Sequence, residues 1–193
     1  CIQLCKNRTM KEQIIDTKSG LTLVVIDDLF NFNDRSIMMN QLYEIPYSFR
    51  TQWDSQVTEF KSQSVLSNIF SKQDWDYFGM ERHPNWKHVK KHLGERTHQR
   101  AWCNLHTGRE MYRYHADHIE PNAISMLFYP NMKWDPDWDG QTIFKTPDLK
   151  DIEYCSEYVP GRIVLFNSRM PHKAVHPNYE SVGFRAIINA VFF

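Results

Sequence analysis

The sequence predicts a mainly β fold of the sandwich or jelly-roll class, with N-terminal helices that buttress one sheet. Two observations support this prediction. From Gln99 onward the chain consists of short apolar runs separated by turn residues, at the spacing of antiparallel strands. Before Gln99, two segments have the apolar spacing of amphipathic helices, which would cover one face of such a sheet.

The composition is typical of one globular domain. The chain has 193 residues, of which 41% are apolar and 24% charged, so we expect a single domain over residues 1–193. Basic and acidic residues number 23 each, so no net field attracts phosphate backbones and nucleic acid is not an expected partner. No apolar run reaches the roughly 18 residues that a membrane helix needs, so no membrane partner is expected. Residues 1–9 precede Met10 and are expected to be added or disordered sequence outside the fold.

The cysteines predict a reducing environment. Four are present, Cys1, Cys5, Cys103 and Cys155, and none forms a C-x-x-C motif. A domain of this size does not need disulfides, so we expect free thiols. The N-terminus also has no apolar segment followed by a small-residue cleavage site. A cytoplasmic location is therefore expected.

The N-terminal half predicts one strand and two helices. The run LTLVVIDDLF predicts a strand that ends near Asp27, after which Asn33 or Asp34 would cap a helix through about Tyr43. Residues 47–79 are mixed in character and predict no definite element.

The second helix is predicted over WKHVKKHLGE. Pro84 suits its first turn, Trp86, Val89 and Leu93 share one side, and the helix stops near Gly94. Its other face is basic, and we expect that face to be solvated rather than a binding patch. The basic residues are Lys87, His88, Lys90, Lys91 and His92.

The C-terminal half predicts only strands. Their sequences are RAWCNLH, MYRYHAD, NAISMLFY, GQTIF, GRIVLFN and GFRAIINAVFF. Both faces of the last run are largely apolar, so this strand is expected to be covered on both sides. Arg185 lies within it, and a buried charge of this kind needs a partner.

Two residues suggest a metal site. His115 and Asp117 are separated by one residue, so in an extended segment their side chains project from the same face. Two ligands hold a transition metal poorly, and an H-x-D pair alone is weak evidence. A core histidine and a turn-capping aspartate are the ordinary roles for such residues.

A third ligand is available after the apolar strand of PGRIVLFNSRMPHKAVHP. Both His172 and His176 follow that strand, and His172 is 55 positions after Asp117, enough for several strands to fold back. Two imidazoles and one carboxylate on one face of an octahedron form the facial triad of non-haem Fe(II) oxygenases. His118 has the opposite parity to His115 and is not expected to be a ligand.

Four segments together resemble the 2-oxoglutarate/Fe(II)-dependent oxygenases, in particular the prolyl 4-hydroxylase-like branch. The resemblance covers roughly residues 100–193, and Asp27 to Tyr43 is similar to the family's strand-then-helix opening. Asp139 stands where the family often has glycine, next to Gly140. The segments are HAD, LFYPNMKWDPDWDGQTIF, PGRIVLFNSRMPHKAVHP and GFRAIINAVFF.

The resemblance implies a double-stranded β-helix (jelly roll) whose core spans about residues 100–193. It implies Fe(II) held by His115, Asp117 and His172, with 2-oxoglutarate as cosubstrate and O₂ as oxidant. Ascorbate is a candidate further reductant. With His172 as the ligand, His176 lies too far past the turn. Asp117 as a ligand argues against halogenation, because chloride would need its position.

The resemblance also implies three contacts to the cosubstrate. Arg185 would bind the far carboxylate, and its planar guanidinium offers two parallel donors that match a carboxylate. Tyr129 resembles the tyrosine that assists this basic residue, and Asn104 lies where some relatives have another polar contact. As ordinary alternatives, Tyr129 would be a core aromatic residue and Arg185 part of an ion pair.

The expected activity is hydroxylation of an unactivated C–H bond, coupled to decarboxylation of 2-oxoglutarate to succinate and CO₂. The substrate would be a prolyl residue of a peptide, or alternatively a free amino acid or small metabolite. A different alternative is a non-catalytic jelly-roll module in which the triad holds Zn²⁺ or Ni²⁺. Arg185 argues against that module, because a structural metal site has no use for it. The segment Trp134–Trp138, WDPDW, would be either a lid beside the site or a surface turn.

Overall fold

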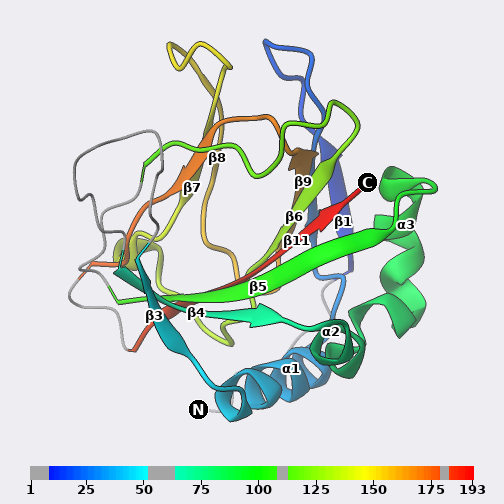
Figure 1. Ribbon diagram of the computed structural model, residues 1–193, viewed down its shortest axis with the longest axis vertical. Coiled ribbons are helices and arrows are strands. Elements are labelled where there is room, and N and C mark those ends of the chain that lie inside the picture. Colours follow the sequence, from blue (N-terminus) through cyan, green and yellow to red (C-terminus); the bar gives the residue numbers. More distant parts are fainter. Residues whose placement is uncertain (1–8, 52–63, 108–112, 179–182) are drawn as a thin grey trace.

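The chain folds into two antiparallel sheets with a layer of helices, as seen in a computed structural model that describes residues 9–51, 64–107, 113–178 and 183–193. The large sheet has eight strands in the order β1-β2-β9-β6-β11-β5-β4-β3 (Figure 1). Its strands are β1 (Lys11–Ile14), β2 (Leu23–Asp27), β3 (Ser48–Thr51), β4 (Ser64–Phe70), β5 (His98–His106), β6 (Ile124–Phe128), β9 (Ile163–Asn167) and β11 (Arg185–Phe192).

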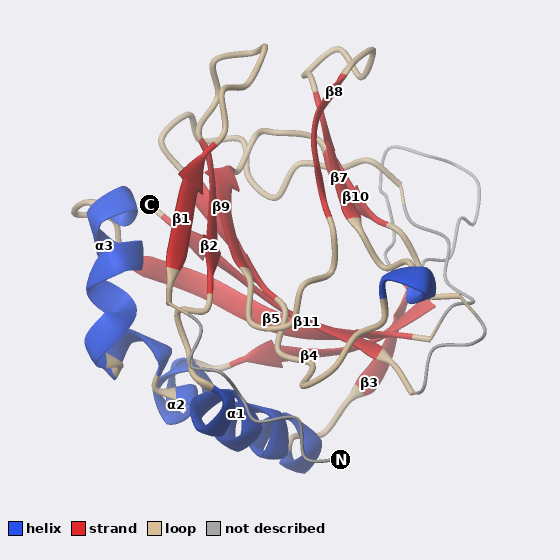
Figure 2. Cartoon of the chain, turned by 180° about the vertical axis from the view of Figure 1, so that it is seen from behind, coloured by secondary structure: helices blue, strands red, loops and turns tan. Residues whose placement is uncertain are grey.

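The small sheet and the helices lie on opposite faces of the large sheet, as Figure 2 shows. The small sheet consists of β10 (His172–Ala174), β7 (Thr142–Lys145) and β8 (Ile152–Ser156), in that order. The helices are α1 (Phe32–Glu44), α2 (Lys72–Phe78) and α3 (Lys87–Leu93), with 3-10 turns at Met80–Arg82, Pro84–Trp86 and Pro136–Trp138. The predicted mainly β architecture with buttressing helices is confirmed.

Each face of the large sheet has its own apolar cluster. The outer cluster packs α1, α2 and α3 on the sheet, while the inner cluster fills the space between the two sheets. Strand β11 contributes to both, because Ile188 belongs to the outer cluster and Ile187 to the inner one. All eight of its residues are buried, which confirms that this strand is covered on both sides.

Helix α1 begins earlier than the sequence suggested. Asn31 is the N-cap, so the prediction of Asn33 or Asp34 was wrong. The Asn31 side chain accepts a hydrogen bond from the backbone N–H of Asp34 at 3.0 Å, and the Asp34 carboxylate accepts one from the backbone N–H of Asn31 at 3.1 Å. Asp34 is therefore the third residue of a reciprocal capping box, a role that the sequence pattern alone does not separate from the cap itself.

Helix α3 is shorter than predicted, because Pro84 begins a 3-10 turn that precedes it. The predicted apolar side is buried and the helix stops before Gly94. Its basic face is not wholly solvated. Glu12 of β1 contacts Lys91 at 2.6 Å and His92 at 3.0 Å, and the Lys91 hydrogen bond lowers the pKa of the Glu12 carboxyl. These contacts tie α3 to the edge of the large sheet.

The strand predicted over MYRYHAD is wrong for the residues that the structure describes. Residues 113–117 form only one isolated bridge, at His115, and residues 108–112 lie outside the described part. The segment from Tyr47 to Gly79, which predicted nothing definite, supplies β3, β4 and α2. The described cysteines, Cys103 and Cys155, are free thiols, whereas Cys1 and Cys5 lie outside the described residues. Among the described helices, none has the length and apolar character needed to cross a membrane.

Candidate metal centre

The two predicted histidine ligands face each other across a backbone pair. The N–H of His115 donates to the carbonyl of His172 at 3.1 Å, and the N–H of His172 donates to the carbonyl of His115 at 2.9 Å. This isolated bridge extends the start of β10, where His172 is the first residue. A pairing with the first residue of β10 therefore positions His115, and residues 113–117 form no strand of their own.

Asp117 is tied to the large sheet. Its backbone N–H donates to the carbonyl of Ser168 at 2.9 Å, and its carbonyl accepts from the Arg100 guanidinium at 2.5 Å. The Ser168 hydroxyl in turn contacts the hydroxyl of Ser125, on β6, at 2.9 Å in a buried position. The three candidate ligands are thus assembled from elements on both sides of the inter-sheet space.

The three side chains converge on one point. The Oδ1 atom of Asp117 lies 3.7 Å from Nε2 of His115 and 3.8 Å from Nε2 of His172, too far for hydrogen bonds. The three potential ligand atoms lie within 4.8 Å of one another. Two ligand atoms that each lie about 2.1 Å from a shared metal ion are at most about 4.2 Å apart. The two histidine–aspartate distances are shorter than this limit, so each pair can bind one metal ion.

The hydrogen bonds around the triad suit a metal ion. Nδ1 of His115 lies 3.1 Å from the carbonyl of Arg113, and Nδ1 of His172 lies 3.1 Å from that of Met170. When each Nδ1–H donates to its carbonyl, each Nε2 keeps the lone pair that a metal needs. Oδ2 of Asp117 is buried and has no hydrogen-bond partner among the described residues. A divalent cation would satisfy these atoms.

The protonation state of His172 also suits a metal ligand. The side chains of His172 and Asp117 are 5% and 4% exposed, whereas that of His115 is 43% exposed. Burial lowers the pKa of His172 to about 4, with Asp117 acting in the opposite direction and His115 in the same direction. His172 is thus neutral near pH 7. The triad is closed on the side of His172 and open on the side of His115.

Arg185 contacts the small sheet at Thr142, two positions along β7 from Phe144, the residue that pairs with His172. It is fully buried at the first position of β11. Its Nε donates to the carbonyl of Gly140 at 2.7 Å, and its Nη2 donates to the Thr142 hydroxyl at 2.9 Å. The guanidinium carbon lies 5.5 Å from the centre of the Tyr129 ring and 5.2 Å from that of Tyr158. Oxygen atoms and aromatic faces therefore hold this cation in a fixed orientation.

Tyr129 meets Arg185 at Thr142. The Tyr129 hydroxyl lies 2.9 Å from the Thr142 hydroxyl, which also accepts from Arg185. Thr142 and Gly140 were not singled out from the sequence. The alternation of Thr142 with Phe144, which lies in the inner cluster, is the signal that could have placed Thr142 on the inner face of its strand.

Asn104 lies beside this group on β5. It is opposite Ile187 of β11, two residues along the strand from Arg185, and its side chain is partly exposed. The two excluded histidines lie elsewhere. The ring of His118 packs against Phe193 with centroids 4.8 Å apart, and His176 is not part of the triad among the described residues.

The WDPDW segment packs against the Arg185 end of the site. The Trp134 ring lies 4.3 Å from that of Tyr158, and its indole N–H donates to the carbonyl of Asp139 at 2.8 Å. A Cβ atom placed on Gly140 would lie 2.9 Å from Trp134 and 3.3 Å from Cδ of Arg185. Gly140, at φ +87°, therefore allows Trp134 and Arg185 to approach the same stretch of backbone.

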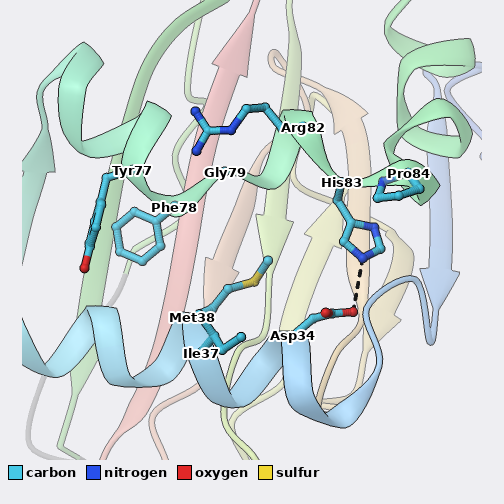
Figure 3. Close-up of a pocket in the computed structure, with 9 residues that line it drawn as sticks. All are labelled: Asp34, Ile37, Met38, Tyr77, Phe78, Gly79, Arg82, His83 and Pro84. Atoms are coloured by element: carbon cyan, nitrogen blue, oxygen red, sulfur yellow. Dashed lines mark hydrogen bonds and ion pairs between the residues drawn. The ribbon is translucent and has the colours of Figure 1, made fainter.

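A separate hollow lies in the helical layer. It has a volume of about 310 Å³ between α1 and the segment from Tyr77 to Pro84 (Figure 3). Its polar feature is the contact between Nε2 of His83 and the Asp34 carboxylate at 3.1 Å. Neither residue belongs to the triad, so this hollow is distinct from the candidate metal centre.

Comparisons with known proteins show similarity of structure only. No family model matches the chain, and no curated protein matches its sequence. A prolyl hydroxylase from Trichoplax adhaerens, in complex with a hypoxia-inducible-factor peptide fragment, is 16% identical with a TM-score of 0.66, covering 91% of this chain and 84% of its own. A Pseudomonas putida prolyl-4-hydroxylase is 15% identical with a TM-score of 0.58, covering 88% of this chain and 91% of its own.

A third similar structure is that of an epimerase rather than a hydroxylase. The non-haem α-ketoglutarate-dependent epimerase SnoN of nogalamycin biosynthesis is 10% identical with a TM-score of 0.64, covering 89% of this chain and 77% of its own. The three structures share the double-stranded β-helix fold with this chain over nearly its whole length. Sequence identities this low establish the fold and leave the activity to be argued from the site.

Proposed function

We propose that this chain, which has the fold of the 2-oxoglutarate/Fe(II)-dependent oxygenases and an intact His-Asp-His triad, is a dioxygenase of that type. It would hydroxylate an unactivated C–H bond and convert 2-oxoglutarate to succinate and CO₂. One observation carries the proposal: a triad able to hold a metal and a buried guanidinium lie against the same strand, with His172 opposite Phe144 of β7 and Arg185 bonded to Thr142. Residues 1–193 would form one such domain, with its core over about 100–193.

The triad would hold the iron. His115 and His172 each offer a lone pair on Nε2, and Asp117 offers a buried carboxylate that offsets part of the metal charge. When bound there, Fe(II) supplies the one-electron chemistry that activates O₂. The carbonyls of Arg113 and Met170 would keep both imidazoles in the tautomer that leaves Nε2 free for the metal.

Arg185 would bind the far carboxylate of 2-oxoglutarate. A metal module without turnover has no need for a cation held at a distance from its ligands, so Arg185 favours the oxygenase over that alternative. Tyr129 supports the cation through Thr142, and Asn104 would make a further polar contact from β5. The surrounding apolar residues exclude water, which strengthens the charge pairing.

A prolyl residue of a peptide is the proposed substrate. It is supported by the similarity to two prolyl hydroxylases, one of them bound to a peptide. A small molecule is the alternative, because SnoN is also similar and belongs to a biosynthetic pathway. The free thiols of Cys103 and Cys155 support the cytoplasmic location that the sequence predicts.

The test is to incubate the protein with Fe(II) and 2-oxoglutarate, with and without ascorbate, and with proline-containing peptides, free amino acids or small metabolites. Succinate and the mass of each product are measured. We expect succinate in stoichiometric amount with a product that has gained one oxygen atom. Asp117→Ala is the control and should form neither product. A wild-type protein that neither binds nor consumes 2-oxoglutarate would overturn the proposal in favour of a passive metal module.

A further inference from the structure

The small sheet carries one aromatic and two basic side chains together on its outer face. His115 forms an antiparallel backbone pair with the first residue of β10, so Tyr114 lies beside Lys173. Side chains alternate along an extended backbone, so Tyr114 and Lys173 point away from the triad. Lys145 lies on the same outer face at the end of β7, one residue past Phe144 of the inner cluster. Tyr114, Lys145 and Lys173 form the small-sheet cluster.

The Tyr114 ring holds both ammonium groups of this cluster. Nζ of Lys173 lies 5.0 Å from the centre of the ring, and Nζ of Lys145 lies 5.3 Å from it. Nζ of Lys145 also donates to the carbonyl of Leu149 at 2.8 Å. Lys173 is opposite Ile143, two positions before Lys145 on β7, so the two lysines are diagonal neighbours on one face. The cluster is therefore a pair of cations held close together.

Neighbouring carboxylates do not balance these two charges. Among the residues that the structure describes, no aspartate or glutamate forms an ion pair with Lys145 or Lys173. Like charges held close together repel each other, so an anion that binds between them removes an unfavourable interaction. The outer face is open to such an anion, because it is turned away from the large sheet (Figure 2) and Cys155, which pairs with Ile143, is exposed.

The position of the cluster relative to the triad indicates the kind of anion. Tyr114 is next to His115, the ligand on the open side of the triad, and the two side chains lie on opposite faces of the same backbone. A ligand that reaches both must pass around the edge of the small sheet beyond β10. The path is on the order of 10 Å, or about three or four residues of extended chain. A polypeptide spans this length, whereas a free amino acid does not.

We propose that the small-sheet cluster binds an acidic segment of a peptide substrate while the residue to be hydroxylated lies at the metal. The inference rests on the proposed function, and it selects a peptide over a small molecule as the substrate. Glutamate or aspartate side chains about three or four positions from the target residue pair with the ammonium groups of Lys145 and Lys173. Peptides with basic residues at those positions are repelled by the same two charges.

The test measures the binding of fluorescent peptides by anisotropy, to protein loaded with Mn(II) and 2-oxoglutarate in the absence of oxygen. Each peptide has one proline between glycine spacers of about three residues, flanked by short runs of glutamate, glutamine or lysine. The variants are the double substitutions Lys145→Gln with Lys173→Gln and Lys145→Glu with Lys173→Glu. The control is Lys87→Gln with Lys90→Gln, which removes the same charge from the exposed face of α3.

We expect the wild type to bind the glutamate peptide about 10-fold more tightly than the glutamine peptide at low ionic strength, and this preference should shrink as salt is added. The double glutamine variant of Lys145 and Lys173 should bind the two peptides equally. The control variant of Lys87 and Lys90 should keep the wild-type preference. The double glutamate variant should bind the lysine peptide more tightly than the glutamate peptide, because the sign of the cluster is reversed.

Two binding results would overturn the inference. Equal affinity of the wild type for the glutamate and glutamine peptides would show that the cluster does not recognise acidic side chains. An equal loss of preference in the control variant would show that only the net charge of the protein matters. Succinate formation with each peptide, measured separately in air with Fe(II), tests the proposed function. A wild type that prefers the glutamate peptide and forms no succinate would contradict that function while leaving the binding of acidic peptides in place.

Discussion

At the scale of single residues, Arg185 separates an oxygenase from a passive metal site. Arg185→Gln leaves the triad untouched and removes one partner of a charge-assisted pair in a poorly solvated space. Losing such a partner costs about 2–5 kcal/mol, so affinity for 2-oxoglutarate should fall by roughly one and a half to three and a half decades. Apparent affinity from succinate formation at fixed iron is the measurement. Arg185→Lys should recover only part of the loss, since an ammonium lacks the planar fork. Wild-type affinity in the glutamine variant would make Arg185 a structural residue.

His172 and His176 provide a matched pair of variants. His172→Ala should abolish binding of Fe(II) or Mn(II), as should His115→Ala and Asp117→Ala, because only two ligands would remain. His176→Ala should bind the metal like the wild type. Calorimetric titration measures each affinity. The reverse result for His172 and His176 would identify His176 as the third ligand.

Gly140 connects Trp134 with the cosubstrate end of the site. Gly140→Ala adds a Cβ that would lie 2.9 Å from Trp134 and 3.3 Å from Arg185, at φ +87°. We expect a loss of at least about 1 kcal/mol in the free energy of unfolding, together with weaker binding of 2-oxoglutarate. Gly20→Ala is the control, because it has a similar φ of +69° and nothing within 4 Å of its added Cβ. Thermal melts and ligand titrations measure both effects. If Gly140→Ala and Gly20→Ala change stability and 2-oxoglutarate binding equally, the contact of Gly140 with Trp134 and Arg185 is unimportant.

At the scale of elements, His98 joins α2 to the large sheet. Its ring stacks on that of Trp75 at 4.6 Å and 4°, and it also contacts Phe192. Burial lowers the pKa of His98, while Glu81 acts in the opposite direction. His98 therefore binds a proton more readily in the unfolded chain than in the folded one. The neutral, buried His98 ring contributes its full stability to the fold above pH about 6.5, and this contribution is lost as the pH falls below that value.

The corresponding prediction compares two proteins at two pH values. The free energy of unfolding, from urea titration of the metal-free protein, should fall more between pH 7 and pH 5.5 for the wild type than for His98→Phe. The phenylalanine keeps an aromatic ring against Trp75 and cannot be protonated. All other titrating groups are common to both proteins, so an equal fall would exclude His98 as a source of pH dependence.

Prediction from sequence succeeded where periodicity determines the element. The runs that became β2, β5, β6, β7, β9 and β11 are apolar and bounded by turn residues, so local pattern and tertiary burial agree. The short β10 was not predicted, because three residues carry too little pattern and its pairing with β7 depends on contacts distant in sequence. The position of His115 likewise depends on a distant contact, its backbone pair with His172. The local pattern could not show this contact, so the sequence predicted a separate strand for His115.

At the scale of the whole molecule, the sequence predicted the metal-binding residues of the site better than the residues that surround and support them. His115 and Asp117 were named from their chemistry and His172 from the family resemblance, and the fold brings the three side chains together. The support for Arg185 from Thr142 and Gly140 was not predicted, because it depends on how the small sheet packs over the large one.

The reciprocal backbone pair between His115 and His172 has a consequence for how a metal ion would enter. The two residues are 57 positions apart, so a flexible chain would bring their imidazoles together only rarely. The backbone pair of the folded chain holds the two residues opposite each other. An arriving cation therefore meets a preassembled bidentate chelate at a high effective concentration of the second imidazole.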